Sequence, residues 1–125
     1  MTVTPGRRLG NFGEAHARRH LEAKGYRFVA AGWSCSRGEL DLVMVDGDEL
    51  VVVEVKTRRG ETMGRAEEAV GSAKARRLFA AAEAFLEANP ALGELVWRVD
   101  LVAITLDQSG VVRDVTHYEN AVYAS

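Results

Sequence analysis

The amino-acid sequence predicts an α/β domain in which a mixed central sheet is flanked by helices. Segments with the periodicity of amphipathic helices alternate with segments rich in β-branched residues, in the order α-β-β-β-α-β-β. Several predicted strands are apolar on both faces, and such strands need helices on both sides of the sheet. The chain has 125 residues, enough for one hydrophobic core, so residues 1–125 are expected to form a single domain.

The first helix is predicted over residues 8–24. The residues that fall near one face of it are Leu9, Gly13, Ala17, His20 and Leu21. Gly25 follows and provides a stop signal. Residues 1–7 contain Pro5 and Gly6 and are expected to form a short flexible tail.

Three strands are predicted to follow the first helix. Residues 26–34 are rich in aromatic and β-branched side chains, which indicates a strand. Residues 40–45 and 50–56 are strongly apolar and are separated by Asp-Gly-Asp-Glu, a sequence typical of a hairpin turn. Residues 58–65 contain glycines between arginines and are predicted to form a loop.

The second half of the chain predicts one long helix and two strands. The helix is expected over residues 72–88, with Ser72 as its N-cap and with Asn89-Pro90 ending it. Its buried stripe consists of Leu78, Ala82, Phe85 and Leu86. Strands are predicted over residues 96–106 and 111–118, and Asp100 in the first of them is expected to hydrogen-bond across the sheet.

Composition narrows the class of protein. Hydrophobic residues make up 47% and charged residues 27%, as in soluble globular proteins. No apolar run approaches the ~20 residues of a membrane span, and the N-terminal residues lack the apolar stretch of a signal peptide. These observations predict a cytoplasmic protein without a membrane partner. Cys35 is the single cysteine, which excludes an internal disulfide.

The hairpin predicts an unusual pair of carboxylates. An even-length turn centred on Gly47 and Asp48 pairs residues whose numbers sum to 95, so Asp41 lies opposite Glu54. Cross-strand neighbours have Cβ atoms only ~4.5–5.5 Å apart. Because side chains alternate along a strand, Lys56 projects from the same face as Glu54.

Two close carboxylates in an apolar sheet are destabilising unless another group compensates their charge. Lys56 and nearby arginines could form a purely structural salt-bridge network, the two acids could share a proton, or a divalent cation could bridge them. Glu14 on the first helix could reach Asp41 and Glu54 as a third acid, or it could form a surface pair with Arg18 at i,i+4. The spacing of the residues leaves these alternatives open.

Short motifs occur in a fixed order along nearly the whole chain. They are Gly13-Glu14, Gly38-Glu39-Leu40-Asp41-Leu42, Val53-Glu54-Val55-Lys56-Thr57-Arg58, Ala69-Val70 with Lys74 and Arg77, Val99-Asp100-Leu101-Val102, and His117 with Asn120-Ala121-Val122. In this order they resemble the YraN family, a branch of the restriction-endonuclease-like PD-(D/E)xK superfamily that is similar to archaeal Holliday-junction resolvases. The resemblance implies an αβββαβ core and Mg²⁺- or Mn²⁺-dependent cleavage of phosphodiester bonds in DNA.

The resemblance also implies roles for single residues. Asp41 and Glu54 would be the metal ligands, Lys56 the catalytic lysine, and Glu14 would complete the acidic cluster directly or through water. The sequence departs from the superfamily pattern at Leu40, where the proline of the superfamily name is absent. Because a family can keep such a site and serve only as a binding module, a non-catalytic nucleic-acid-binding protein is the alternative.

Basic residues follow the predicted site along the chain. Those expected to contact DNA phosphates are Arg58, Arg59, Arg65, Lys74 and Arg77. A solvated basic surface is the plainer interpretation of each one. Branched or single-stranded DNA is the expected partner, and symmetric cleavage of a junction would need two sites, which favours a homodimer.

Overall fold

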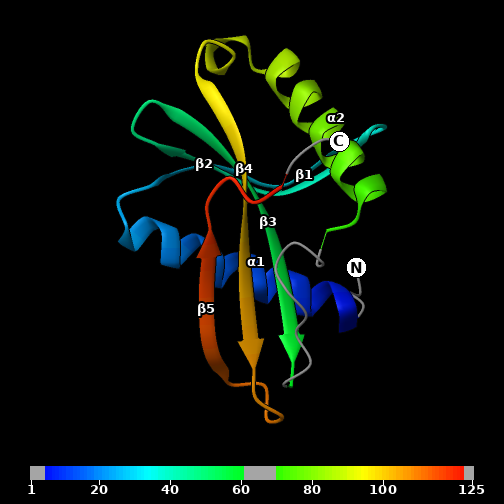
Figure 1. Ribbon diagram of the computed structural model, residues 1–125, viewed down its shortest axis with the longest axis vertical. Helices are drawn as coiled ribbons and strands as arrows, with labels where there is room; N and C mark the ends of the chain where they lie inside the picture. Colours follow the sequence, from blue (N-terminus) through cyan, green and yellow to red (C-terminus); the bar gives the residue numbers. More distant parts are fainter. Residues whose placement is uncertain (1–4, 61–69, 123–125) are drawn as a thin grey trace.

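Figure 1 shows the computed structural model, which describes residues 5–60 and 70–122. In this part of the chain, one five-stranded sheet lies between helices α1 (Pro5–Ala23) and α2 (Ser72–Ala88). A short 3₁₀ helix, η2 (Pro90–Leu92), follows α2. The α/β class and the mixed sheet between helices are therefore confirmed, and the arrangement is that of a restriction-endonuclease-like core.

The sheet is mixed because a helix connects its third and fourth strands. The strands are β1 (Arg27–Cys35), β2 (Gly38–Asp46), β3 (Glu49–Arg59), β4 (Val96–Leu106) and β5 (Val112–Tyr118), and they lie side by side in this order. Strands β3 and β4 are parallel, since the chain returns through α2 between them, and every other neighbouring pair is antiparallel.

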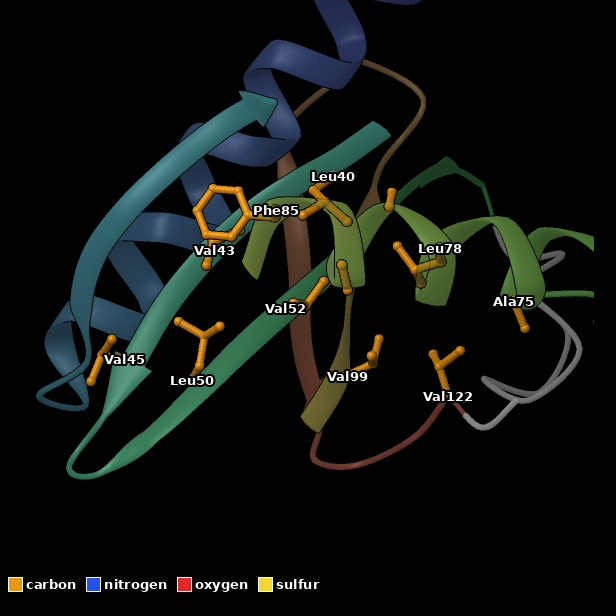
Figure 2. Close-up of a cluster of buried hydrophobic side chains, with 12 residues drawn as sticks. Leu40, Val43, Val45, Leu50, Val52, Ala75, Leu78, Phe85, Val99 and Val122 are labelled. Atoms are coloured by element: carbon orange, nitrogen blue, oxygen red, sulfur yellow. The ribbon is translucent and has the colours of Figure 1, made fainter. Parts of the chain in front are cut away.

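Successive residues of the central strands enter two different cores, one on each face of the sheet. Under α2, Val43 and Val52 pack with Phe85 (Figure 2). On the opposite face, Met44 and Val51 belong to a second cluster of buried residues that includes Ala17 and Leu21 of α1. This double burial explains why these strands are apolar at almost every position.

Element boundaries agree with the predictions where local sequence sets them. Helix α2 and strand β4 have the predicted ranges, although the N-cap of α2 is Gly71 and not Ser72. The predicted tail is wrong for residues 5–7, because α1 begins at Pro5, where the missing N–H of proline has no helical partner to lose. Residues 1–4 lie outside the described part.

Strand β3 is longer than predicted. Its last residues pair in parallel with β4, up to Arg59 opposite Leu106, so Arg58 and Arg59 belong to a strand and not to a loop. The remainder of the predicted loop, from residue 61 on, lies outside the described residues.

Two glycines set how closely the helices approach the sheet. A Cβ on Gly13 of α1 would lie 2.1 Å from the hydroxyl oxygen of Thr57, and one on Gly38 would lie 3.1 Å from the carbonyl oxygen of Arg77 in α2. Gly38 also has a φ of 150°, which residues with a side chain rarely adopt. Both helices therefore press against the sheet near the places where Asp41 and Glu54 enter it.

Candidate active site

The hairpin register brings Asp41 to strand β3 as predicted. Backbone pairing runs from Asp46 opposite Glu49 to Leu42 opposite Val53, with the pair numbers summing to 95. At the next position the carboxylate of Asp41 accepts a hydrogen bond of 2.9 Å from the backbone N–H of Val55. Asp41 is thus held against β3 by its own side chain, next to Glu54.

Glu54 is one of the charged side chains that the sheet buries, with 3% of its surface exposed. Its Oε1 atom lies 2.7 Å from Nζ of Lys74 and 3.4 Å from Nζ of Lys56. Lys56 was expected here from the alternation along β3. Lys74 comes from the first turn of α2, so the site is built from both the sheet and a helix.

Asp41 lies in surroundings that favour its protonated form. Burial raises the pKa of Asp41 to about 7, and the negative charge of Glu54 adds to this effect. Glu14 also raises the pKa of Asp41 through its charge, and so does a hydrogen bond between Asp41 and Glu54, whereas the Val55 N–H opposes the shift. Near neutral pH the protonated and ionised forms of Asp41 are therefore both populated.

The pKa values of the two lysines are shifted in opposite directions. Burial and the neighbouring Lys74 ammonium lower the pKa of Lys56, and this outweighs the attraction of Glu54. For Lys74, burial is outweighed by the hydrogen bonds to Glu54 and Lys56 and by the charges of the two acids, so its pKa is raised. Lys56 is consequently the amine that loses its proton more readily, while Lys74 remains a cation.

A pocket of about 210 Å³ opens beside Glu54, between the beginning of β2 and the first turns of α2. The residues that line it are Gly38, Glu39, Glu54, Lys74, Arg77 and Leu78. Charged groups of both signs thus line this pocket. Glu39 is exposed and belongs to this lining.

Comparison of the sequence with known proteins identifies the family of this chain. The profile described as "Uncharacterised protein family UPF0102" matches residues 13–104, a range that holds Glu14, Asp41, Glu54, Lys56 and Lys74. The chain belongs to the UPF0102 family. This is the YraN family that the motifs indicated, so the resemblance seen in the sequence is confirmed.

Relatives in the UPF0102 family cover most of this chain. A UPF0102 protein of Roseiflexus castenholzii is 42% identical over 115 residues, which span 92% of this chain and 93% of the relative. One of Ectopseudomonas mendocina is 48% identical over 99 residues, covering 79% and 83% of the two chains, and one of Frankia casuarinae is 44% identical over 113 residues, covering 90% and 94%. The similarity therefore extends over most of this chain.

The donor set of this UPF0102 chain suits a hard, largely hydrated cation. Among the described residues, no group of three or more His, Cys, Asp or Glu side chains is placed to hold a metal ion. The available ligands are therefore the two carboxylates of Asp41 and Glu54. Mg²⁺ is commonly held by one or two carboxylates while it keeps several waters. The pair fits Mg²⁺ or Mn²⁺ and does not resemble a zinc site.

Glu14 of α1 lies close enough to Asp41 for its negative charge to raise the pKa of Asp41. Direct completion of the acidic cluster by Glu14 stays a prediction, and so does its participation through water.

The predicted phosphate contacts fall into three groups. Arg58 and Arg59 are exposed at the end of β3, and Arg77 is exposed at the pocket. Lys74 lies on Glu54 instead of facing solvent, although 42% of its side chain is exposed. Arg65 lies outside the described residues.

The sequence held a signal for the position of Lys74. It precedes the buried residue Leu78 by four positions, so the two share the face of α2 that meets the sheet. The charge of Lys74 favours a surface position, and the helical spacing alone does not show that its ammonium reaches Glu54.

Proposed function

We propose that this chain is a Mg²⁺- or Mn²⁺-dependent DNA endonuclease that hydrolyses phosphodiester bonds. The observation that carries the proposal is that Asp41 lies beside the buried Glu54. The amine of Lys56 lies 3.4 Å from the Glu54 carboxylate, and a pocket lined in part by charged residues opens alongside. Burying Glu54 beside a second, partly buried carboxylate is costly, and a site for a divalent cation gives the arrangement a use.

Each residue has a distinct part in the proposed reaction. Asp41 and Glu54 would hold the cation, which when bound supplies Lewis-acid polarisation of a phosphate oxygen. The Val55 N–H fixes the direction of the Asp41 carboxylate. Lys56, whose pKa is lowered chiefly by burial, can accept a proton from the attacking water or orient that water.

The proposed partners follow from the surface. Arg58 and Arg59 at the end of β3, and Arg77 in the pocket lining, would contact phosphates of the DNA. Branched or single-stranded DNA is the first substrate class to test. We infer a homodimer for symmetric cleavage of a junction, and a cytoplasmic location. Within the described residues, neither helix has the length and apolarity to span a membrane.

The decisive experiment is incubation of single-stranded, flapped and four-way DNA with the protein in Mn²⁺ and in EDTA. We expect cleavage in Mn²⁺, none in EDTA, and a loss of roughly 10²–10³-fold in the Asp41→Asn and Glu54→Gln variants. Asp48→Asn, a matched change at the exposed hairpin turn, should cleave like the wild type.

Two other outcomes have clear meanings. Cleavage that Asp41→Asn leaves unchanged would remove the proposed site from the reaction. DNA binding that survives Glu54→Gln, without any metal-dependent cleavage, would instead establish a non-catalytic nucleic-acid-binding protein that keeps the nuclease fold.

A further inference from the structure

Lys74 and a divalent cation would both need the carboxylate of Glu54. The ammonium of Lys74 lies 2.7 Å from Oε1 of Glu54, the distance of a charge-assisted hydrogen bond. Lys56 approaches the same oxygen less closely, at 3.4 Å. In the absence of metal, the charge of Glu54 is therefore balanced mainly from helix α2.

The fold fixes the base of Lys74 and leaves its tip free to move. Ala75 and Leu78 of α2 are buried against the sheet (Figure 2), and the backbone of Arg77 touches Gly38, so the first turns of the helix are anchored. The Lys74 side chain, by contrast, is 42% exposed. It can leave Glu54 without disturbing the packing of α2.

Lys56 does not have this freedom. It stands on β3 two residues from Glu54, and only 16% of its side chain is exposed. A cation that must be displaced when metal arrives would therefore be Lys74.

The pocket gives the displaced ammonium a destination. Lys74 and Arg77 line it together, next to Glu54. Two cationic side chains of α2 in the lining of one small pocket suit a phosphate group, whose oxygens accept charge-assisted hydrogen bonds.

We propose that Lys74 is an exchangeable counter-ion of Glu54: it holds the carboxylate while the metal is absent, and metal binding releases it to a phosphate of the DNA in the adjoining pocket. The inference rests on the proposed nuclease function. It means that the Lys74 ammonium competes with the metal ion for the carboxylate of Glu54. Metal binding and DNA binding are then coupled through one side chain. Lys74 would weaken the binding of metal and strengthen the binding of DNA.

The test is a Mn²⁺ titration of the DNA-free protein, followed by electron paramagnetic resonance of the unbound ion. We expect Lys74→Gln to bind Mn²⁺ roughly tenfold more tightly than the wild type, because the competing charge is gone. Arg76→Gln removes the same charge from an exposed position on the same helix and should change the affinity little. Lys74→Gln should nevertheless cleave DNA more slowly, so that affinity and rate change in opposite directions.

The outcomes separate this inference from the proposed function. If the wild type binds Mn²⁺ and Lys74→Gln binds it no more tightly, the exchange is refuted while the metal site stands. If neither protein binds Mn²⁺, the metal-dependent function is refuted and the exchange with it. An equal gain in Arg76→Gln would show that general charge, and not contact with Glu54, is responsible, which also refutes the exchange.

A second measurement needs no variant. The Nζ resonance of a lysine in a tight ion pair is distinguishable by ¹⁵N NMR from that of a solvated lysine. Titration of the labelled wild-type protein with Mg²⁺ should shift the Lys74 signal toward the solvated position. A Lys74 signal that stays constant while Mg²⁺ saturates the site would overturn the proposal.

Discussion

Asp41 and Glu54 lie side by side, yet the protein compensates their charges in different ways. Glu54 takes two ammonium groups, and Asp41 takes a backbone N–H and, near neutral pH, a proton. Of the alternatives that the sequence left open, the salt-bridge network is thus present around Glu54, while Asp41 beside it retains its proton up to a higher pH than an ordinary aspartate. A divalent cation would replace both, since it provides positive charge for the two carboxylates together.

The pKa of Asp41 makes stability depend on pH. Because burial and the charge of Glu54 raise it from 3.8 to about 7, the folded protein holds this proton more tightly than the unfolded chain. An ionised Asp41 lowers the free energy of unfolding. This loss of stability is absent below pH ~4, grows between pH ~4 and ~7, and is complete above pH ~7.

Asp41→Asn should therefore stabilise the metal-free protein in a pH-dependent manner. In EDTA, we expect its melting temperature to exceed that of the wild type by several degrees at pH 8 and to match it near pH 4. The exposed Asp48→Asn should show no such difference. The same stabilisation of Asp41→Asn at both pH values would mean that the protonation argument fails.

Individual site residues were predictable from the sequence to different degrees. The pairing of Asp41 with Glu54 followed from strand alternation and an even turn, which need only local sequence. The contact of Lys74 with Glu54 depends on how closely α2 approaches β2 at Gly38, and such a distance is set by tertiary packing.

At the scale of elements, a second buried charge cluster joins the C-terminal part of the sheet. Asp100 of β4 is fully buried and accepts hydrogen bonds from Nε of Arg98 at 3.0 Å and from the backbone N–H of Asn120 at 2.7 Å. His117 of β5 lies 2.7 Å from the other Asp100 oxygen. Arg98 also pairs with Glu49 of β3, so the cluster connects three strands and the segment after β5.

We expect Asp100→Ala to destabilise the fold by about 3–5 kcal/mol, the usual cost of removing one partner from a buried ionic network. Arg98 and His117 would then be left without their buried acceptor. Urea denaturation followed by circular dichroism would measure this change. Asp114→Ala at an exposed site of β5 is the control, and it should cost less than ~0.5 kcal/mol. Similar losses in the two variants would contradict the structural role of the cluster.

Asp100 also makes the fold sensitive to acid. Burial alone would raise the pKa of Asp100, but its hydrogen bonds to His117, Asn120 and Arg98 lower it below the ordinary value. Its stabilising contribution is therefore present above pH ~4 and is lost as the pH falls further, the opposite direction to that of Asp41.

Elements were predicted most accurately where the chain marks their ends. Helix α2 ends at Asn89-Pro90 as expected, because the residue before a proline disfavours helix. Strand β3 continues past its last apolar residue because β4 is there to pair with Thr57, Arg58 and Arg59. A partner from a distant part of the sequence leaves no local signal.

At the scale of the whole molecule, basic residues are arranged around one end of the sheet. Arg58 and Arg59 are exposed where β3 ends, at the opposite end of the strand from the hairpin turn at Gly47. The total charge of −2 conceals this arrangement, because acidic residues predominate after residue 77. Binding of DNA would therefore be local and salt-dependent.

The double variant Arg58→Gln/Arg59→Gln tests this surface. If both residues contact phosphates, the slope of log affinity for double-stranded DNA against log salt should decrease by roughly 1.8, about 0.9 for each contact. Fluorescence anisotropy at several salt concentrations measures the slope. Arg27→Gln, exposed at the hairpin end of the sheet, should leave it unchanged. An unchanged slope in the double variant would place the DNA elsewhere.

Gly38 has a consequence for how this protein tolerates mutation. Because the backbone of α2 lies 3.1 Å from the place where its side chain would begin, even one added methyl group would push the helix and move the base of Lys74 away from Glu54. A position without any functional group thereby controls an electrostatic contact. A mutational scan that reads function only from charged residues would overlook it, whereas a scan of every position should find Gly38 as sensitive as the ions that it brings together.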